Sequence, residues 1–181
     1  MERSEALALM RQHIQTVNLQ KHVLAVEAVM GALAQRLGED EAAWGLAGLL
    51  HDLDFEYTKE SPQHHTMQTL ELLEDYNLDP RILHAIQAHA GHVPLESAMD
   101  KAIYCADPVT GFVVACALMH PTKKIANVDV AFMANRFKEK RFAAGASREQ
   151  MTSCNSLGLE LEEFLELSRK AMEEIADELG L

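Results

Sequence analysis

The chain has 181 residues, of which 48% are hydrophobic, and this is enough for one domain with a sizeable buried core. Its net charge of −12 argues against a dedicated nucleic-acid binder, because such proteins need a basic face to displace counterions from phosphates. The sequence contains neither a secretory signal pattern nor a run of about 18 apolar residues, so we expect no membrane association and a cytoplasmic location.

Helical periodicity runs through the chain with almost no β-branched alternation, and it predicts an all-α fold. Helices are expected at about 4–14, 18–37, 40–54, 64–76, 79–91 and 96–120, with three more in 128–142, 147–158 and 159–180. Pro108 predicts a kink at Asp107 in the long apolar helix, because proline lacks the backbone donor. No repeat or low-complexity linker interrupts the chain, so we expect a single domain over 1–181.

Histidines are the unusual component: there are nine, gathered mainly between His51 and His92. In the stretch AGLLHDLDFEY, an apolar helix leads directly into His51 and Asp52. A buried imidazole or carboxylate without a partner is costly, and a divalent metal would satisfy several of them together. The same reasoning applies to four further residues that lie beside apolar positions near helix ends or at the expected kink: His22, His65, His89 and Asp107.

Several neighbouring residues leave alternatives open. His65 is favoured over the adjacent His64 because of its register with the leucines that follow. Asp54 and Glu56 are expected to be solvated loop carboxylates rather than groups that fix a metal water. A phosphate substrate of so acidic a protein needs positive charge, and Arg141 and Arg148 are the candidate substrate-binding residues.

In their order and spacing, these residues resemble the H…HD…D signature of the HD superfamily of metal-dependent phosphohydrolases. The resemblance implies an HD-domain helical bundle, with a metal-binding core at about 15–120 and a C-terminal helical extension at 121–181. It implies a first metal held by His22, His51, Asp52 and Asp107. His65 and His89 match the two extra histidines of subgroups that hold two metals, so Asp52 would bridge to a second ion there.

The function predicted from these features is hydrolysis of a phosphoester by a metal-activated water, with His51 and Asp52 as catalytic residues. One or two divalent transition metals are expected among Fe, Mn, Zn, Co and Ni, with Mg possible. The expected substrate is a small phosphorylated metabolite or nucleotide, with no dedicated nucleic-acid binding, and a homo-oligomer is possible. The alternatives are a non-catalytic regulator that binds a metal or nucleotide, and a di-iron oxygenase that uses the same ligands.

Overall fold

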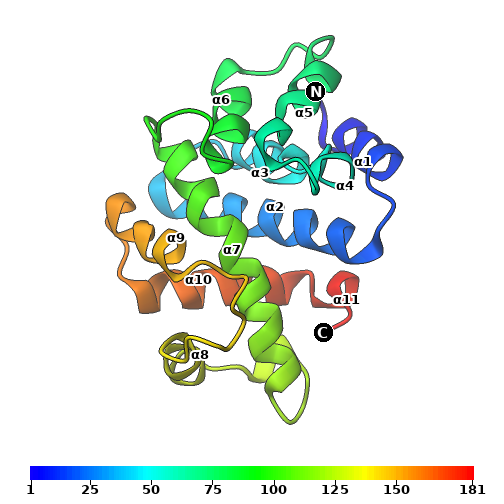
Figure 1. Cartoon of the computed structure of the whole chain (residues 1–181). Helices are drawn as coiled ribbons and strands as arrows, with labels where there is room; N and C mark the ends of the chain where they lie inside the picture. The colour runs from blue at the N-terminus through cyan, green and yellow to red at the C-terminus, as the bar shows by residue number, and fades with distance from the viewer.

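The computed structural model describes residues 1–181 and consists of helices joined by turns, without a β-strand (Figure 1). This confirms the all-α prediction. The first half contains α1 (Arg3–His13), α2 (Val17–Leu37), α3 (Glu41–Leu50), α4 (Phe55–Thr58), the 3₁₀ turn η1 (Pro62–His64), α5 (Met67–Leu73) and α6 (Pro80–His89). The second half contains α7 (Ala98–Met119), η2 (Ile125–Asn127), α8 (Val130–Phe137), α9 (Arg148–Thr152), η3 (Ser153–Leu157), α10 (Leu161–Glu174) and α11 (Ala176–Leu179).

Two long helices organise the molecule. In Figure 1, α7 crosses α2 in the middle of the molecule and continues to the end where α8 lies, while α5 and α6 lie toward the opposite end. The helix α10 packs against both α2 and α7. One hydrophobic core of 42 buried residues extends from Ala6 to Leu179, so the C-terminal helices share the core of the N-terminal ones.

A close approach between α2 and α3 sets the position of the histidine-rich turn. A Cβ atom added at Gly48 would lie 2.8 Å from the backbone nitrogen of Glu27 and 2.9 Å from the backbone carbon of Val26. These distances are well inside ordinary carbon contacts of about 3.5–4.0 Å, so only glycine fits without displacing a helix. The end of α3, two residues after Gly48, is thereby held close to α2.

Several predicted helices have different boundaries in the structure. The helix expected over 128–142 ends at Phe137, and those expected over 147–158 and 159–180 are each divided in two. Two further differences concern the candidate metal ligands. The helix expected to run to residue 54 ends at Leu50, and residues 51–54 form a turn before the short α4. The helix expected from residue 64 begins at Met67, because Pro62 opens a 3₁₀ turn and Thr66 adopts a left-handed backbone with φ of 70°. His65 was predicted at the start of a helix, but it lies in the turn that connects η1 to α5.

The long apolar helix α7 begins with a capping box between Ser97 and Asp100 and continues through Pro108. The expected kink at Asp107 therefore does not end the helix. By length and composition α7 is also apolar enough to cross a membrane, with a mean hydropathy of 1.7. However, 61% of its most apolar window is buried inside the protein, and a core helix passes the same test.

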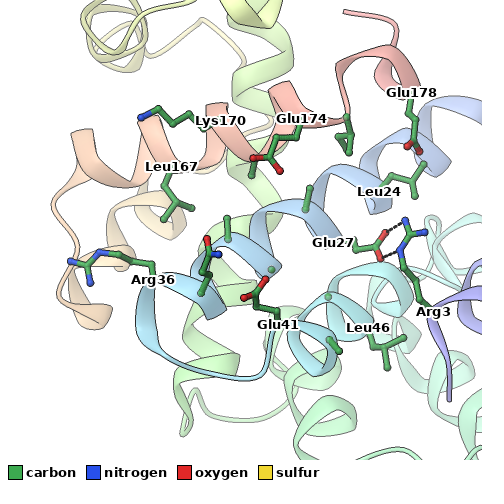
Figure 2. Close-up of a pocket in the computed structure, with 18 of the residues that line it drawn as sticks. Arg3, Leu24, Glu27, Arg36, Glu41, Leu46, Leu167, Lys170, Glu174 and Glu178 are labelled. Carbon is green, nitrogen blue, oxygen red and sulfur yellow. Dashed lines mark hydrogen bonds and ion pairs between the residues drawn. The ribbon is translucent and has the colours of Figure 1, made fainter.

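A groove of about 1250 Å³ lies between α2, α3 and α10 (Figure 2). The groove is lined on α2 by small residues that include Ala28, Gly31 and Ala32. Glutamates such as Glu41 of α3 and Glu174 of α10 line it as well. Gly31 is nine residues after His22 and so lies on the opposite face of α2, at about 100° per residue. None of the six predicted metal ligands lines this groove.

Candidate metal centre

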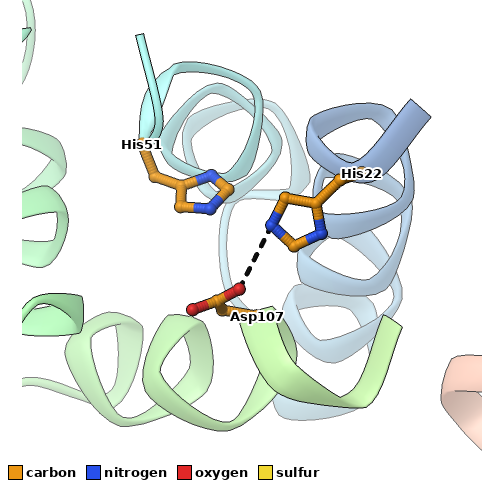
Figure 3. A group of neighbouring side chains, drawn as sticks. All are labelled: His22, His51 and Asp107. Atoms are coloured by element: carbon orange, nitrogen blue, oxygen red, sulfur yellow. Dashed lines mark ion pairs between the residues drawn. The ribbon is translucent and has the colours of Figure 1, made fainter. Parts of the chain in front are cut away.

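The structure brings the six predicted metal ligands together, although they come from separate elements. His22 comes from α2, His51 and Asp52 from the turn after α3, His65 from the turn after η1, His89 from the end of α6, and Asp107 from the middle of α7. Figure 3 shows His22, His51 and Asp107 pointing toward one another from α2, the turn after α3, and α7. His22 Nε2 lies 3.1 Å from Asp107 Oδ1.

Asp52 lies at the centre of the cluster, and its two oxygens face different sets of histidines. Asp52 Oδ1 is 3.2 Å from His65 Nε2, 3.5 Å from His51 Nε2 and 3.6 Å from His89 Nε2. Asp52 Oδ2 is 3.7 Å from His22 Nε2. Two groups have ligand atoms close enough to hold an ion: His22 with His51 and Asp107, and Asp52 with His51 and His89.

Two of the histidines are oriented by the helix ends on which they sit. His51 Nδ1 donates to the Gly48 carbonyl at 2.7 Å, and His89 Nδ1 donates to the Ile86 carbonyl at 2.6 Å. The last carbonyls of a helix have no partner within the helix, so a histidine three residues later can satisfy one of them. A carbonyl can only accept, so the proton is on Nδ1 and Nε2 is left to face the cluster.

His65 and His22 are oriented in the same sense by side chains. His65 Nδ1 donates to Asp54 Oδ1 at 2.8 Å. His22 Nδ1 lies 3.0 Å from the hydroxyl of Thr110, and that hydroxyl donates to the Asp107 carbonyl at 2.9 Å. The Thr110 hydroxyl therefore accepts the Nδ1 proton of His22. Partners of this kind fix the ring and its tautomer in metal-ligating histidines.

All four rings therefore turn Nε2 toward the same small volume, where the protein provides no donor for these atoms. His65 Nε2 and His89 Nε2 are 3.2 Å apart, and His51 Nε2 is buried without a hydrogen-bond partner. Lone pairs that face one another beside carboxylates require a cation between them, either a proton or a metal. The residues present fit a divalent metal on this evidence.

The pKa values of His51, His65 and Asp52 are consistent with this need for a cation. Burial lowers the pKa of His51 to about 4, so its ring is neutral at pH 7 and can act as a ligand. Burial also lowers the pKa of His65, but hydrogen bonds to Asp52 and Asp54 outweigh it and raise the value to about 9. Burial disfavours the Asp52 carboxylate, yet the histidines around it, His51 and His65 above all, hold its pKa well below the usual range. Without a metal, a proton on His65 thus supplies the positive charge.

The side chains on one side of the cluster are buried, whereas those on the other side are partly exposed to solvent. The side chain of Asp52 is 7% exposed and that of His51 is fully buried, whereas Asp107 is 32% exposed. His22, beside Asp107, is also partly exposed. The side of His22 and Asp107 is therefore the more solvent-accessible side of the cluster.

Asp54 is a residue whose role the sequence analysis missed. It is completely buried and not a solvated loop carboxylate. Besides accepting from His65, its carboxylate accepts from the backbone nitrogen of Thr69 at 3.1 Å, which ties α5 to the turn that carries Asp52. Its spacing in His-Asp-x-Asp was the available signal. Glu56, in contrast, accepts from the backbone nitrogens of Gln15 and Thr16 ahead of α2 and so faces away from this role.

The two arginines proposed as substrate ligands have other surroundings. Arg148 donates to the carbonyls of Phe137, Phe142, Ala143 and Ala146, and its guanidinium lies 4.7 Å from the centre of the Phe112 ring. Phe112 is five residues after Asp107 and so about 140° away around α7. Arg148 therefore stabilises the segment after α8, which corrects the prediction. Arg141 is exposed in that same segment, and Figure 1 shows α8 at the end of the molecule opposite α5 and α6.

Comparison with known proteins places this geometry in context. A family model described as HD domain matches residues 19–153. Ribonuclease Y of Sulfurovum sp. (strain NBC37-1) is 28% identical over 165 residues, which cover 90% of this chain and 32% of that protein. Ribonuclease Y of Oleidesulfovibrio alaskensis is 33% identical over 94 residues, or 52% of this chain and 18% of that protein. Ribonuclease Y of Clostridium kluyveri is 26% identical over 165 residues.

The chain spans about a third or less of the length of these curated relatives. No solved structure matches the chain with significance. The relatives overturn the prediction of a small metabolite as partner and of no nucleic-acid binding, because their name is that of ribonucleases. The error lay in applying the net charge of the whole chain to a local site, where bound cations can contact a phosphate whatever the charge of the remaining surface.

Proposed function

We propose that this protein hydrolyses phosphodiester bonds of RNA, since the chain belongs to the HD domain family. This family is one of metal-dependent phosphohydrolases, and it is the one that the sequence resembles. The observation that carries the proposal is the convergence of four Nε2 atoms and the carboxylates of Asp52 and Asp107 on one volume. The name of the relatives supports RNA as the substrate class.

The residues would divide the work between two neighbouring ion positions. His22, His51 and Asp107 form one group, and His65 and His89 lie on the other side of Asp52. Asp52 is the residue that can serve both positions, because its two oxygens face the two sides. Asp54 and Thr110 would keep His65 and His22 in the ligating orientation.

When bound, divalent cations would lower the pKa of water and stabilise negative charge on the phosphoryl oxygens. The protein contributes the fixed geometry and the exclusion of water from the inner side, where His51 and Asp52 are buried. The exposed sides of His22 and Asp107 give a phosphodiester access. Transition metals remain the proposed class, with Mn, Fe, Zn, Co and Ni as candidates.

The test uses the whole chain, stripped of metal with a chelator and then loaded separately with Mn²⁺, Fe²⁺, Zn²⁺, Co²⁺, Ni²⁺ or Mg²⁺. Cleavage of an end-labelled RNA oligonucleotide is followed on a gel, with a DNA of the same sequence alongside. We expect cleavage with at least one metal and loss of more than 99% of the activity in Asp52→Ala, on the order of what removal of a central catalytic group costs. Glu56→Gln, outside the cluster, is the matched control.

Each other result would assign a different function. Metal bound without cleavage of any phosphodiester would favour the non-catalytic regulator. Oxygen consumption by an iron-loaded protein would favour the oxygenase. Cleavage that survives Asp52→Ala in a folded protein would show that the activity does not come from this site.

A further inference from the structure

Large apolar side chains are exposed beside the metal centre. Of the six exposed large hydrophobic residues in the chain, four belong to the start of α2, to α4 and to the start of α5; we call them the apolar rim: Val17, Phe55, Tyr57 and Met67. The other two, Leu118 and Met119, lie at the far end of α7. Exposed apolar groups that gather in one place commonly mark a binding surface.

The segments of the apolar rim are held next to one another. Tyr57 donates to the His13 carbonyl, and Glu56 accepts from the backbone of Gln15 and Thr16, so α4 lies against the entry to α2. The helix α4 also contacts η1, and Met67 follows two residues after His65. The rim is therefore continuous with the segment that carries one of the metal-ligand candidates.

Within the rim, Phe55 contacts the metal centre directly. Its ring centroid is 5.7 Å from that of His65, with the two ring planes at 80°. An edge-to-face contact of this kind can cover only one face of the Phe55 ring. Since Phe55 is 41% exposed, the ring also presents surface to solvent one side chain away from the ions.

The fold does not need an exposed phenylalanine at this position. The short helix α4 is held by buried Thr58, whose hydroxyl donates to the Asp54 carbonyl, and by the contacts of Glu56 and Tyr57 to the segment before α2. An aromatic ring open to solvent beside a phosphodiester-cleaving centre suits a flat, apolar partner. In a nucleic acid that partner is a base, because every base offers a π face for stacking.

We propose that Phe55 is a substrate-binding residue that stacks on the base of a nucleotide adjoining the phosphodiester at the metal centre. The proposal rests on the proposed function, since it deepens the recognition of the same substrate. Stacking is tolerant of base identity, so Phe55 would select for the presence of a base and not for one base over another. It would act on substrate binding and therefore on KM more than on kcat.

The test compares Phe55→Leu with the unchanged protein on two oligomers of equal length: an oligoadenylate and a ribose-phosphate oligomer without bases. We expect Phe55→Leu to raise KM for the oligoadenylate about tenfold, a typical loss for one stacked base, with little change in kcat. KM for the base-free oligomer should be the same for both proteins. Phe55→Trp should restore the low KM. Leu118→Ala, which changes an exposed apolar residue at the far end of α7, should change nothing.

The outcomes separate this inference from the proposed function. If the unchanged protein cleaves neither oligomer with any metal, the proposed function fails. Binding of labelled oligoadenylate, measured by fluorescence anisotropy, then still tests Phe55, because its loss should weaken binding about tenfold. If cleavage occurs and Phe55→Leu shifts KM equally for both oligomers, or lowers only the metal content, Phe55 merely packs on His65 and the inference is wrong.

Discussion

The close approach of α2 and α3 at Gly48 makes a quantitative prediction for the variant Gly48→Ala. In a helix interior, alanine is more favourable than glycine by about 1 kcal/mol. At Gly48 the new methyl group would overlap backbone atoms of Glu27 and Val26, which cannot rotate away. Overpacking of this kind costs about 1–3 kcal/mol. Gly31, also within a helix, is the matched control because a Cβ there meets nothing within 4 Å.

Because both variants gain the same helix preference, the difference between them isolates the cost of the overlap. Gly31→Ala should raise the free energy of unfolding by about 1 kcal/mol, whereas Gly48→Ala should be less stable than Gly31→Ala by about 1–3 kcal/mol. For a chain of this size, each 1 kcal/mol shifts Tm by about 2–4 °C. Urea and thermal unfolding of the metal-free proteins, followed by circular dichroism, measure both quantities.

The same variant also tests the link between helix packing and the metal centre. Displacing α3 from α2 would move His51 away from His22, whose ring centroids are now 5.3 Å apart. Metal affinity, measured by competition with a chelator, should therefore fall in Gly48→Ala and not in Gly31→Ala. Equal stability and equal metal affinity of the two variants would refute the argument that Gly48 sets the geometry of the site.

Three further predictions concern the surroundings of the metal centre. Asp54→Asn removes the charge that orients His65 and should weaken metal binding about 10–100-fold, as measured by competition with a chelator. Glu56→Gln should leave metal binding unchanged, and equal losses in the two variants would contradict this role of Asp54. Because the pKa of His65 is raised to about 9, its ring is protonated in the metal-free protein at pH 7, and metal binding should release this proton, with the release declining as the pH rises through 9. Calorimetry in two buffers of different ionisation enthalpy would detect it, and heats that do not depend on the buffer would count against it. Arg148→Met should lower the free energy of unfolding by about 2–4 kcal/mol without changing metal affinity, whereas Arg141→Met should change neither, as urea titrations can show.

The site residues that could be predicted from the sequence are polar residues placed among apolar ones, where burial is expected. His51 and Asp52 follow an apolar helix, and polar groups in such a place must find a partner in the core. The same reasoning pointed to His22, His89 and Asp107, and the structure brings them into one cluster. Their role as ligands remains a prediction that metal analysis has to test.

The misses have a common physical cause, which is that they depend on tertiary packing. Asp54 is flanked by a polar stretch and looks solvated, but α5 folds back over the turn and buries it. Arg148 looks like a free cation, but the chain after α8 wraps around it and presents four carbonyls. His65 lies in a turn because of the left-handed backbone at Thr66, and no periodicity reveals that.

The unequal burial of the cluster has a consequence for how the protein acquires its ions. An ion on the inner side would lie between the buried Asp52 and His89, with only the partly exposed His65 toward solvent, and so would exchange slowly. An ion between His22 and Asp107 would be in reach of solvent and chelators. A chelator would therefore remove the outer ion sooner than the inner one, and stepwise replacement of the metal should yield molecules that hold two different ions.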